Sequence, residues 1–186
     1  MTYGSNHWKT ISEMVTSIAL PILPHIRSRK LRSEIISNLF ESQAAKYFNS
    51  ISIPVQAAES DRDPDLVFLQ TQTPCEIKVT GSDHPIATKL KWMGGKYSKR
   101  TSDYVFIGWH YQPTNRTLYG EEKETIQYFI ATKFVDESEW KIIDNGKENY
   151  YATVYTTEEL LQDSYEIIVG DYQQKTIMFQ NVSNIH

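Results

Sequence analysis

Two short apolar segments separated by a polar turn place the strongest constraint on how this chain folds. Residues 66–69 read Leu-Val-Phe-Leu, which has the length and composition of a short buried strand. The polar residues 70–74 follow, and residues 75–80 have the composition of a second strand. We therefore predict a hairpin that places the two strands side by side, with Asp65 at the start of the first.

Charged side chains are concentrated where this predicted hairpin opens. Because successive side chains of a strand alternate between its faces, Glu76 and Lys78 share one face and Ile77 takes the other. With Asp65, two carboxylates and one amine are expected to converge. Crowded ionised carboxylates are costly unless a cation lies between them, and their oxygens suit Mg²⁺. The pattern predicts a magnesium site, and a surface hairpin with a solvated Glu–Lys pair is the alternative.

Residues 64–65 read Pro-Asp and residues 76–78 read Glu-Ile-Lys. Together they resemble the PD-(D/E)xK motif of the restriction-endonuclease-like nucleases. Both halves of the motif are intact, and the resemblance covers about residues 28–135. It implies an α/β (α+β) fold with a restriction-endonuclease-like core, in which a mixed central β-sheet is flanked by helices.

The resemblance also implies a reaction and the residues that perform it. Nucleases of this family hydrolyse phosphodiester bonds with one or two Mg²⁺ ions, so double-stranded DNA is the expected substrate. The implied catalytic residues are Asp65, Glu76 and Lys78, and the implied metal ligands are Asp65, Glu76 and the backbone carbonyl of Ile77. Lys78 would orient the attacking water and stabilise the charge that develops on the phosphate.

A glutamate on the helix that precedes the motif is a further candidate metal ligand. Apolar residues recur at helical spacing over residues 28–48, and a basic segment of Arg27, Arg29, Lys30 and Arg32 leads into this helix. Glu34 and Glu41 point nearly the same way, two turns apart. Nucleases of the resembled family often place a glutamate of this helix at the metal, and we assign Glu41 to that role rather than Glu34. A solvated carboxylate on the helix face is the alternative for either residue.

Basic residues also follow the second strand of the predicted hairpin. Residues 81–85 are expected to begin a helix, because a capping side chain and an early proline occur there. The predicted contacts to DNA phosphates lie in the same stretch and are Lys89, Lys91, Lys96, Lys99 and Arg100. A solvated charged face is the alternative interpretation of such a run.

The chain of 186 residues has the length of a single domain with a proper core. Within this single nuclease domain, residues 1–186, we expect the core at 28–135 and a β-rich C-terminal extension at 136–186. An N-terminal helix is predicted over residues 6–20. Its buried stripe is predicted to comprise Trp8, Ile11, Val15 and Ile18.

Composition indicates a cytoplasmic protein with no membrane partner. Apolar residues make up 40% of the chain, yet no run approaches the length of a membrane-spanning helix. The N-terminus lacks the features of a signal peptide. Cys75, the single cysteine, cannot form an internal disulfide, and we interpret it as a small buried hydrophobe.

A net charge of −4 is unexpected for a protein that grips DNA alone, because phosphate contacts supply most of the non-specific affinity. We also recognise no DNA-reading module in the sequence. The size and acidity resemble the small cleavage subunit of a heterodimeric type IIS restriction endonuclease. Such a subunit cuts one strand when joined to a larger DNA-recognition subunit with its own nicking site. Two alternatives are a self-sufficient homodimeric type II restriction or repair endonuclease and a non-catalytic DNA- or protein-binding module of the same fold.

Overall fold

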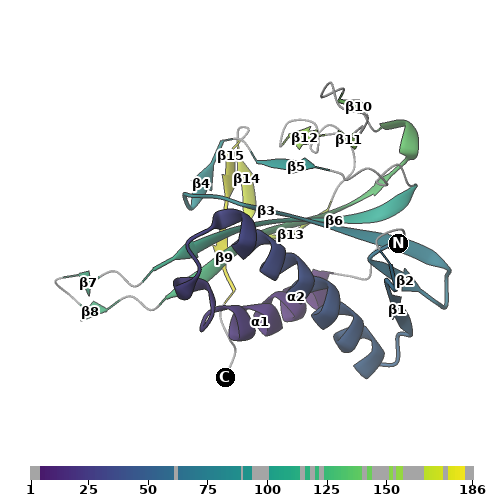
Figure 1. Ribbon diagram of the computed structural model, residues 1–186, viewed down its shortest axis with the longest axis horizontal. Coiled ribbons are helices and arrows are strands. Elements are labelled where there is room, and N and C mark those ends of the chain that lie inside the picture. The colour runs from purple at the N-terminus through teal and green to yellow at the C-terminus, as the bar shows by residue number, and fades with distance from the viewer. Residues whose placement is uncertain are drawn as a thin grey trace.

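The computed structural model describes residues 5–60, 63–88, 90–93, 101–113, 116–117, 120–121, 124–139, 142–143, 151–152, 154–156, 166–173 and 176–182. Within these residues the chain forms a central sheet, two α-helices on one side of it, and smaller sheets (Figure 1).

The central sheet has seven strands in the described part of the chain, in the order β1-β2-β3-β6-β9-β13, with β16 also pairing with β9. These strands are β1 (Val55–Ala57), β2 (Leu66–Phe68), β3 (Thr73–Gly81), β6 (Ser102–Gln112), β9 (Thr125–Val135), β13 (Glu166–Val169) and β16 (Gln180–Asn181). β3 and β6 run parallel, whereas the other pairs are antiparallel. The protein is therefore of the mixed α+β class with a mixed central sheet, as predicted.

The N-terminal helix predicted from apolar spacing is confirmed as α1 (Ser5–Ala19). Three residues of its predicted stripe are fully buried: Trp8, Ile11 and Val15. Ile18 was predicted to join them but is 38% exposed. Four residues beyond Val15, where the helix returns to the same face, Ala19 is buried instead.

The second predicted helix is confirmed as α2 (Arg29–Ser50), and the short 3₁₀ helix η1 (Leu23–His25) precedes it. Ser28 caps α2, because its hydroxyl accepts a hydrogen bond from the backbone N–H of Leu31 at 3.3 Å. The buried residues of α2 recur every fourth position and are Ile36, Phe40, Ala44 and Phe48. No described helix has the length and apolar character needed to cross a membrane.

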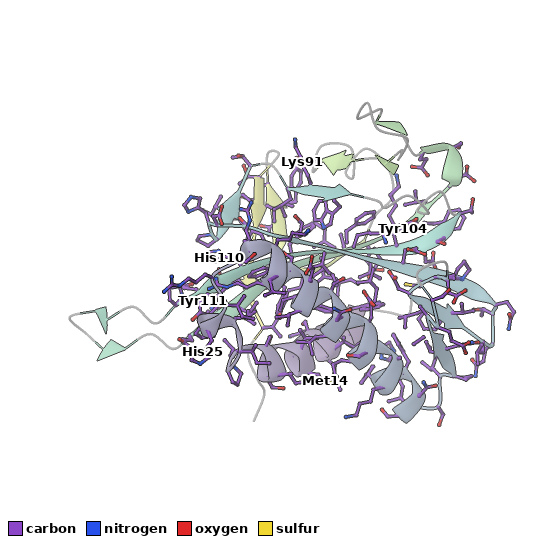
Figure 2. The ribbon with its side chains drawn as sticks, viewed as in Figure 1. Met14, His25, Lys91, Tyr104, His110 and Tyr111 are labelled. Atoms are coloured by element: carbon purple, nitrogen blue, oxygen red, sulfur yellow. The ribbon has the colours of Figure 1, made fainter. Side chains whose placement is uncertain are left out.

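The two faces of the central sheet are covered differently. Both described helices pack on one face, where they share a core with Ile77 of β3 and with Val105 and Ile107 of β6. On the opposite face, Tyr104 and Phe106 of β6 contribute to a second core beneath short strands. Figures 1 and 2 show the helices with Met14 on one side and Tyr104 nearer the short strands. Helices thus flank only one face of the described sheet.

The short strands arise from two distant parts of the chain. On the second face lie β4 (Ile86–Ala87), β5 (Lys91–Met93), β12 (Val154–Thr156), β14 (Asp171–Gln173) and β15 (Thr176–Met178). The remaining short elements are β7 (Arg116–Thr117), β8 (Gly120–Glu121), η2 (Glu137–Glu139), β10 (Ile142–Ile143) and β11 (Tyr151–Ala152). Because β13 and β16 pair with β9, part of the predicted C-terminal extension completes the central sheet.

The helix predicted to begin at residues 81–85 is wrong. The Ser82 hydroxyl does accept the N–H of His84 at 3.2 Å, but the chain then continues into β4 and β5. β4 pairs with β15, and β5 pairs with β12. Trp92 of β5 is buried and donates its indole N–H to the carbonyl of Ile107 at 3.1 Å. Pairing with distant strands therefore outweighed the local capping signal.

Candidate active site

The predicted hairpin is confirmed, and its end positions the charged residues. β2 and β3 pair antiparallel through three register partners, the last of which joins Leu66 to Cys75. Asp65 and Glu76 are therefore the first residues beyond the paired region. Beyond this point, β6 is the one strand that pairs with β3 among the described residues, so the other edge of β3 is open. The open edge of β3 is where the candidate site lies.

Asp65 is held against this open edge by a backbone hydrogen bond. Its Oδ2 atom accepts the N–H of Ile77 at 2.6 Å, in the place where a neighbouring strand would otherwise supply a carbonyl. The contact satisfies a strand N–H and fixes the direction of the carboxylate. The side chain of Asp65 remains 21% exposed, so solvent or a ligand can still reach it.

Lys78 lies between the two carboxylates of the motif. Its Nζ atom is 3.0 Å from Glu76 Oε2 and 3.8 Å from Asp65 Oδ2. The side chains of Glu76 and Lys78 are 6% and 18% exposed, whereas Ile77 is buried in the core on the helix side. The predicted alternation of faces is confirmed. Because Glu76 and Lys78 are largely shielded from water, their charges interact more strongly than those of a surface pair.

Glu41 of α2 belongs to the same electrostatic cluster. The pKa of Glu41 is raised from 4.5 to about 7, mainly by burial and next by the charge of Asp65. Ser37, which donates its hydroxyl to Glu41 Oε1 at 3.1 Å, and then Lys78 act in the opposite direction on this pKa. We refer below to Glu41, Asp65, Glu76 and Lys78 as the acidic cluster.

The second glutamate considered from the sequence, Glu34, lies elsewhere. Its side chain is 54% exposed and pairs with Lys30 along the helix at 3.8 Å. The structure thus brings Glu41, and not Glu34, into the neighbourhood of Asp65. The two residues point nearly the same way, so their separation of about 10 Å along α2 and the way the helix docks on β3 decide between them.

Asp65, Glu76 and Glu41 are the residues of the acidic cluster that could act as ligands of a divalent cation. Among the described residues, no three His, Cys, Asp or Glu side chains form a ready-made metal-binding group. In the acidic cluster, the Lys78 ammonium lies between two carboxylates and is the only positive charge beside three acidic side chains. Burial is the largest cause of the raised pKa of Glu41, and the charges of Asp65 and Glu76 add to it, so a nearby cation would lower this pKa. Carboxylate oxygens are the ligands that Mg²⁺ prefers.

Cys75 lies next to the acidic cluster in the sequence but is not suited to chemistry. It is fully buried, and burial followed by the charge of Asp103 raises its pKa well above the usual value. The side chain therefore remains a thiol, consistent with the interpretation as a buried hydrophobe.

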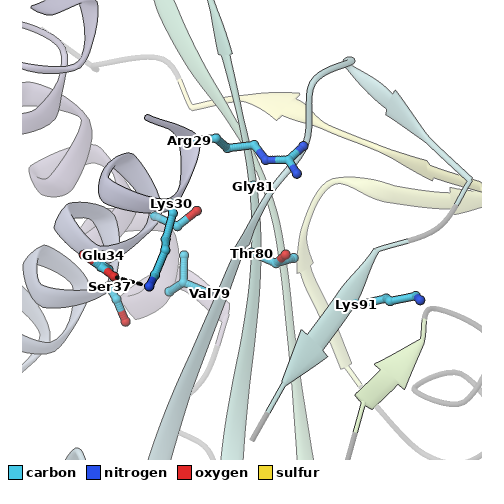
Figure 3. Close-up of a pocket in the computed structure, with 9 residues that line it drawn as sticks. Arg29, Lys30, Glu34, Ser37, Val79, Thr80, Gly81 and Lys91 are labelled. Carbon is cyan, nitrogen blue, oxygen red and sulfur yellow. Dashed lines mark ion pairs between the residues drawn. The ribbon is translucent and has the colours of Figure 1, made fainter. Parts of the chain in front are cut away.

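An open groove of about 720 Å³ lies beside the acidic cluster, between α2 and the end of β3 (Figure 3). Its lining residues are Arg29, Lys30, Ser33, Glu34, Ser37, Val79, Thr80, Gly81 and Lys91. Arg29 and Lys30, two residues of the basic segment noted in the sequence, lie in the first turn of α2 and line this groove. Only the spatial approach of this segment to β3 and β5 reveals the groove.

Of the predicted phosphate contacts, only Lys91 lies within the described residues. It is exposed and lines the groove. Four others fall outside the described residues: Lys89, Lys96, Lys99 and Arg100.

Comparison of the chain with protein-family models finds no match, and comparison with curated proteins finds none either. What the protein does must therefore be inferred from its own residues.

Proposed function

We propose that this protein is a Mg²⁺-dependent endonuclease that hydrolyses DNA phosphodiester bonds at the acidic cluster. The observation that carries the proposal is the position of Lys78, with its Nζ atom 3.0 Å from Glu76 and 3.8 Å from Asp65 at an open strand edge. These residues are also those of the PD-(D/E)xK motif. A mixed sheet with a parallel β3–β6 pair is compatible with the restriction-endonuclease-like core that this motif implies.

Each residue of the acidic cluster has its own proposed role in hydrolysis. Asp65, Glu76 and the backbone carbonyl of Ile77 would hold Mg²⁺, and Glu41 would hold part of its water shell. When bound, the ion lowers the pKa of a water molecule and neutralises charge on the scissile phosphate. The hydrogen bond from Ile77 keeps Asp65 aimed at the strand edge. Ser37 occupies Oε1 of Glu41, which leaves Oε2 to accept a hydrogen bond from water.

Lys78 supplies a positive charge that belongs to the protein itself, in addition to the charge of the bound ion. Its ammonium donates a hydrogen bond to Glu76, and it can donate to the attacking water or to a phosphate oxygen in the same region. The donor is pre-positioned by the two carboxylates and therefore needs little reorganisation during the reaction.

The proposal includes a partner that reads the DNA sequence. One acidic cluster cleaves one strand, so a double-strand break needs a second cluster from another chain. With a net charge of −4, the protein is expected to bind DNA weakly by itself. We therefore propose a cleavage subunit that nicks one strand when a larger DNA-recognition subunit brings it to the site.

The partner can be replaced by a heterologous sequence-specific DNA-binding domain fused to the full chain. Tethering raises the effective concentration of DNA at the acidic cluster into the millimolar range, about the value for a short flexible linker. The fusion should nick one strand at a fixed offset in Mg²⁺, and the same fusion carrying Asp65→Asn should not. Absence of nicking by the wild-type fusion would refute the nuclease. Specific double-strand cutting by an untethered, stable dimer would instead establish the homodimeric alternative.

A further inference from the structure

The groove beside the acidic cluster concentrates positive charge in a chain that is acidic overall. Arg29 and Lys30 contribute from the first turn of α2, and Lys91 contributes from β5 on the opposite wall (Figure 3). No acidic residue lies in that first helical turn to offset them. Glu34 is the one carboxylate among the lining residues, against three cations.

The ion pairs of these cations are easily exchanged for other anions. Arg29 pairs with Asp83, and both side chains are more than half exposed. Lys30 is 88% exposed in its 3.8 Å pair with Glu34. Within the described residues, Lys91 makes no ion pair. Exposed pairs of this kind contribute little to stability, so a ligand with strong negative charge can replace them.

Two further side chains of the groove can donate hydrogen bonds. The Ser33 hydroxyl accepts the indole N–H of Trp109 at 3.1 Å, which leaves its own hydrogen for another acceptor. Thr80 lines the opposite wall on β3. Phosphate oxygens commonly take hydrogen bonds from Ser and Thr hydroxyls in addition to the charges of Arg and Lys.

The groove is continuous with the acidic cluster through two elements. β3 carries Glu76 and Lys78 and then, without interruption, the groove residues 79–81. On α2, Ser37 both lines the groove and donates to Glu41. A linear polyanion that enters the groove is therefore led along β3 to the acidic cluster.

We propose that this groove binds the sugar–phosphate backbone of nucleic acid on one side of the bond that is cleaved, with Arg29 and Lys91 as its main phosphate contacts. Lys78 and Gly81 are three positions apart along β3, which is about 10 Å, or about three nucleotides of a duplex strand. The identity of the ligand rests on the proposed function, whereas the position and charge of the groove do not.

The test measures binding in EDTA, where the proposed chemistry cannot proceed. A fluorescently labelled DNA duplex is titrated at low salt with the wild type and with the double variant Arg29→Gln/Lys91→Gln. The matched control is Lys9→Gln/Lys46→Gln, which removes the same charge from two exposed helix lysines outside the groove. Circular dichroism and thermal melts establish that both variants are folded.

The groove variant should bind about tenfold more weakly than the wild type, and its log–log salt slope should fall by about two. The control should bind within about twofold of the wild type, because its lysines contribute only long-range attraction. Equal binding by the groove and control variants would overturn the proposal, as would a wild type that binds no duplex at low salt.

The fused protein separates this inference from the proposed function. If the fusion never cuts and only the groove variant binds DNA more weakly, the nuclease proposal is wrong and the groove proposal stands. If the fusion cuts in an Asp65-dependent way and both double variants bind DNA equally well, the groove proposal is wrong and the nuclease proposal stands. When the fusion cuts, shortening the duplex on one side of the nick should slow cleavage more than shortening it on the other. Equal sensitivity to the two truncations would count against the groove.

Discussion

The two halves of β3 face opposite electrostatic environments within a short distance along one strand. At the hairpin end, Glu76 and Lys78 lie with Asp65 and Glu41 in a partly buried group dominated by carboxylates. At the other end, residues 79–81 line an exposed groove in which cations outnumber carboxylates. One end is the proposed site of a divalent cation, and the other is the proposed site of phosphate.

The contrast implies that the proposed cleavage and the proposed DNA binding can be altered separately. The charges of the acidic cluster are shielded from solvent and coupled, so each substitution there alters the whole group. The charges of the groove are solvated and nearly independent, so substitutions there should add. Variants that lose cleavage but keep DNA binding, or the reverse, test this separation directly.

The largest effect is expected from neutralising the carboxylates of the acidic cluster. Asp65→Asn and Glu76→Gln should each reduce cleavage by about a thousandfold or more, because each removes a charge on which ion binding depends. Both should bind duplex DNA in EDTA at least as well as the wild type, since less negative charge faces the phosphates. Nicking assays with the fusion and duplex titrations measure the two properties, and wild-type cutting by either variant would end the assignment.

The next effect concerns the shape of the positive charge. Lys78→Arg should lower cleavage by about a hundredfold, nearly as much as Lys78→Ala, because a broad guanidinium cannot replace a point ammonium between Asp65 and Glu76. Lys91→Arg in the open groove is the matched control and should cut at close to the wild-type rate. If Lys78→Arg is fully active, Lys78 acts only as a general field charge.

A smaller effect should be visible as stabilisation by Mg²⁺ in the absence of DNA. At ten times the dissociation constant, a ligand that binds only the folded state adds about 1.4 kcal/mol, or about 3–6 °C in Tm for a chain of this size. Asp65→Asn and Glu76→Gln should lose this increase, and Arg29→Gln should retain it. Differential scanning fluorimetry at rising Mg²⁺ concentration checks this, and an equal increase in Tm in all three variants would show that the ion binds elsewhere.

The smallest effect expected is a pH dependence of stability that arises from Glu41. Its pKa is about 7 in the folded protein, compared with 4.5 for an ordinary glutamate, so the folded state binds more protons between these values. The free energy of unfolding should therefore decrease as pH rises from about 4.5 through 7. Glu41→Gln removes this decrease and should be more stable than the wild type at pH 8.5 but not at pH 4.

Urea midpoints across this pH range measure the effect, and Glu34→Gln provides the control. Glu34 is exposed and pairs only along its own helix, so its substitution should leave the pH profile unchanged. Identical profiles for Glu41→Gln and the wild type would show that the pKa of Glu41 is not raised in the folded protein.

Local sequence patterns were sufficient to predict the parts of this protein that depend on neighbours along the chain. The alternation of side chains in a strand placed Glu76 and Lys78 on one face, and the short turn before them brought Asp65 alongside. Apolar residues at helical spacing over residues 28–48 identified α2. These features arise from backbone geometry within one hairpin or one helix, so a local pattern is sufficient to predict them.

Which helix and strand surfaces contact one another depends on the tertiary structure. Glu34 and Glu41 carry the same signal on one helix, and the docking of α2 on β3 brings Glu41 alone to the acidic cluster. Residues 86–87 and 91–93 carry a capping signal in front of them but form strands, because partners far along the chain pair with them. The groove likewise needs Arg29 and Lys91 on opposite walls. Burial of apolar faces fixes these arrangements, and that energy depends on contacts between segments that no local pattern encodes.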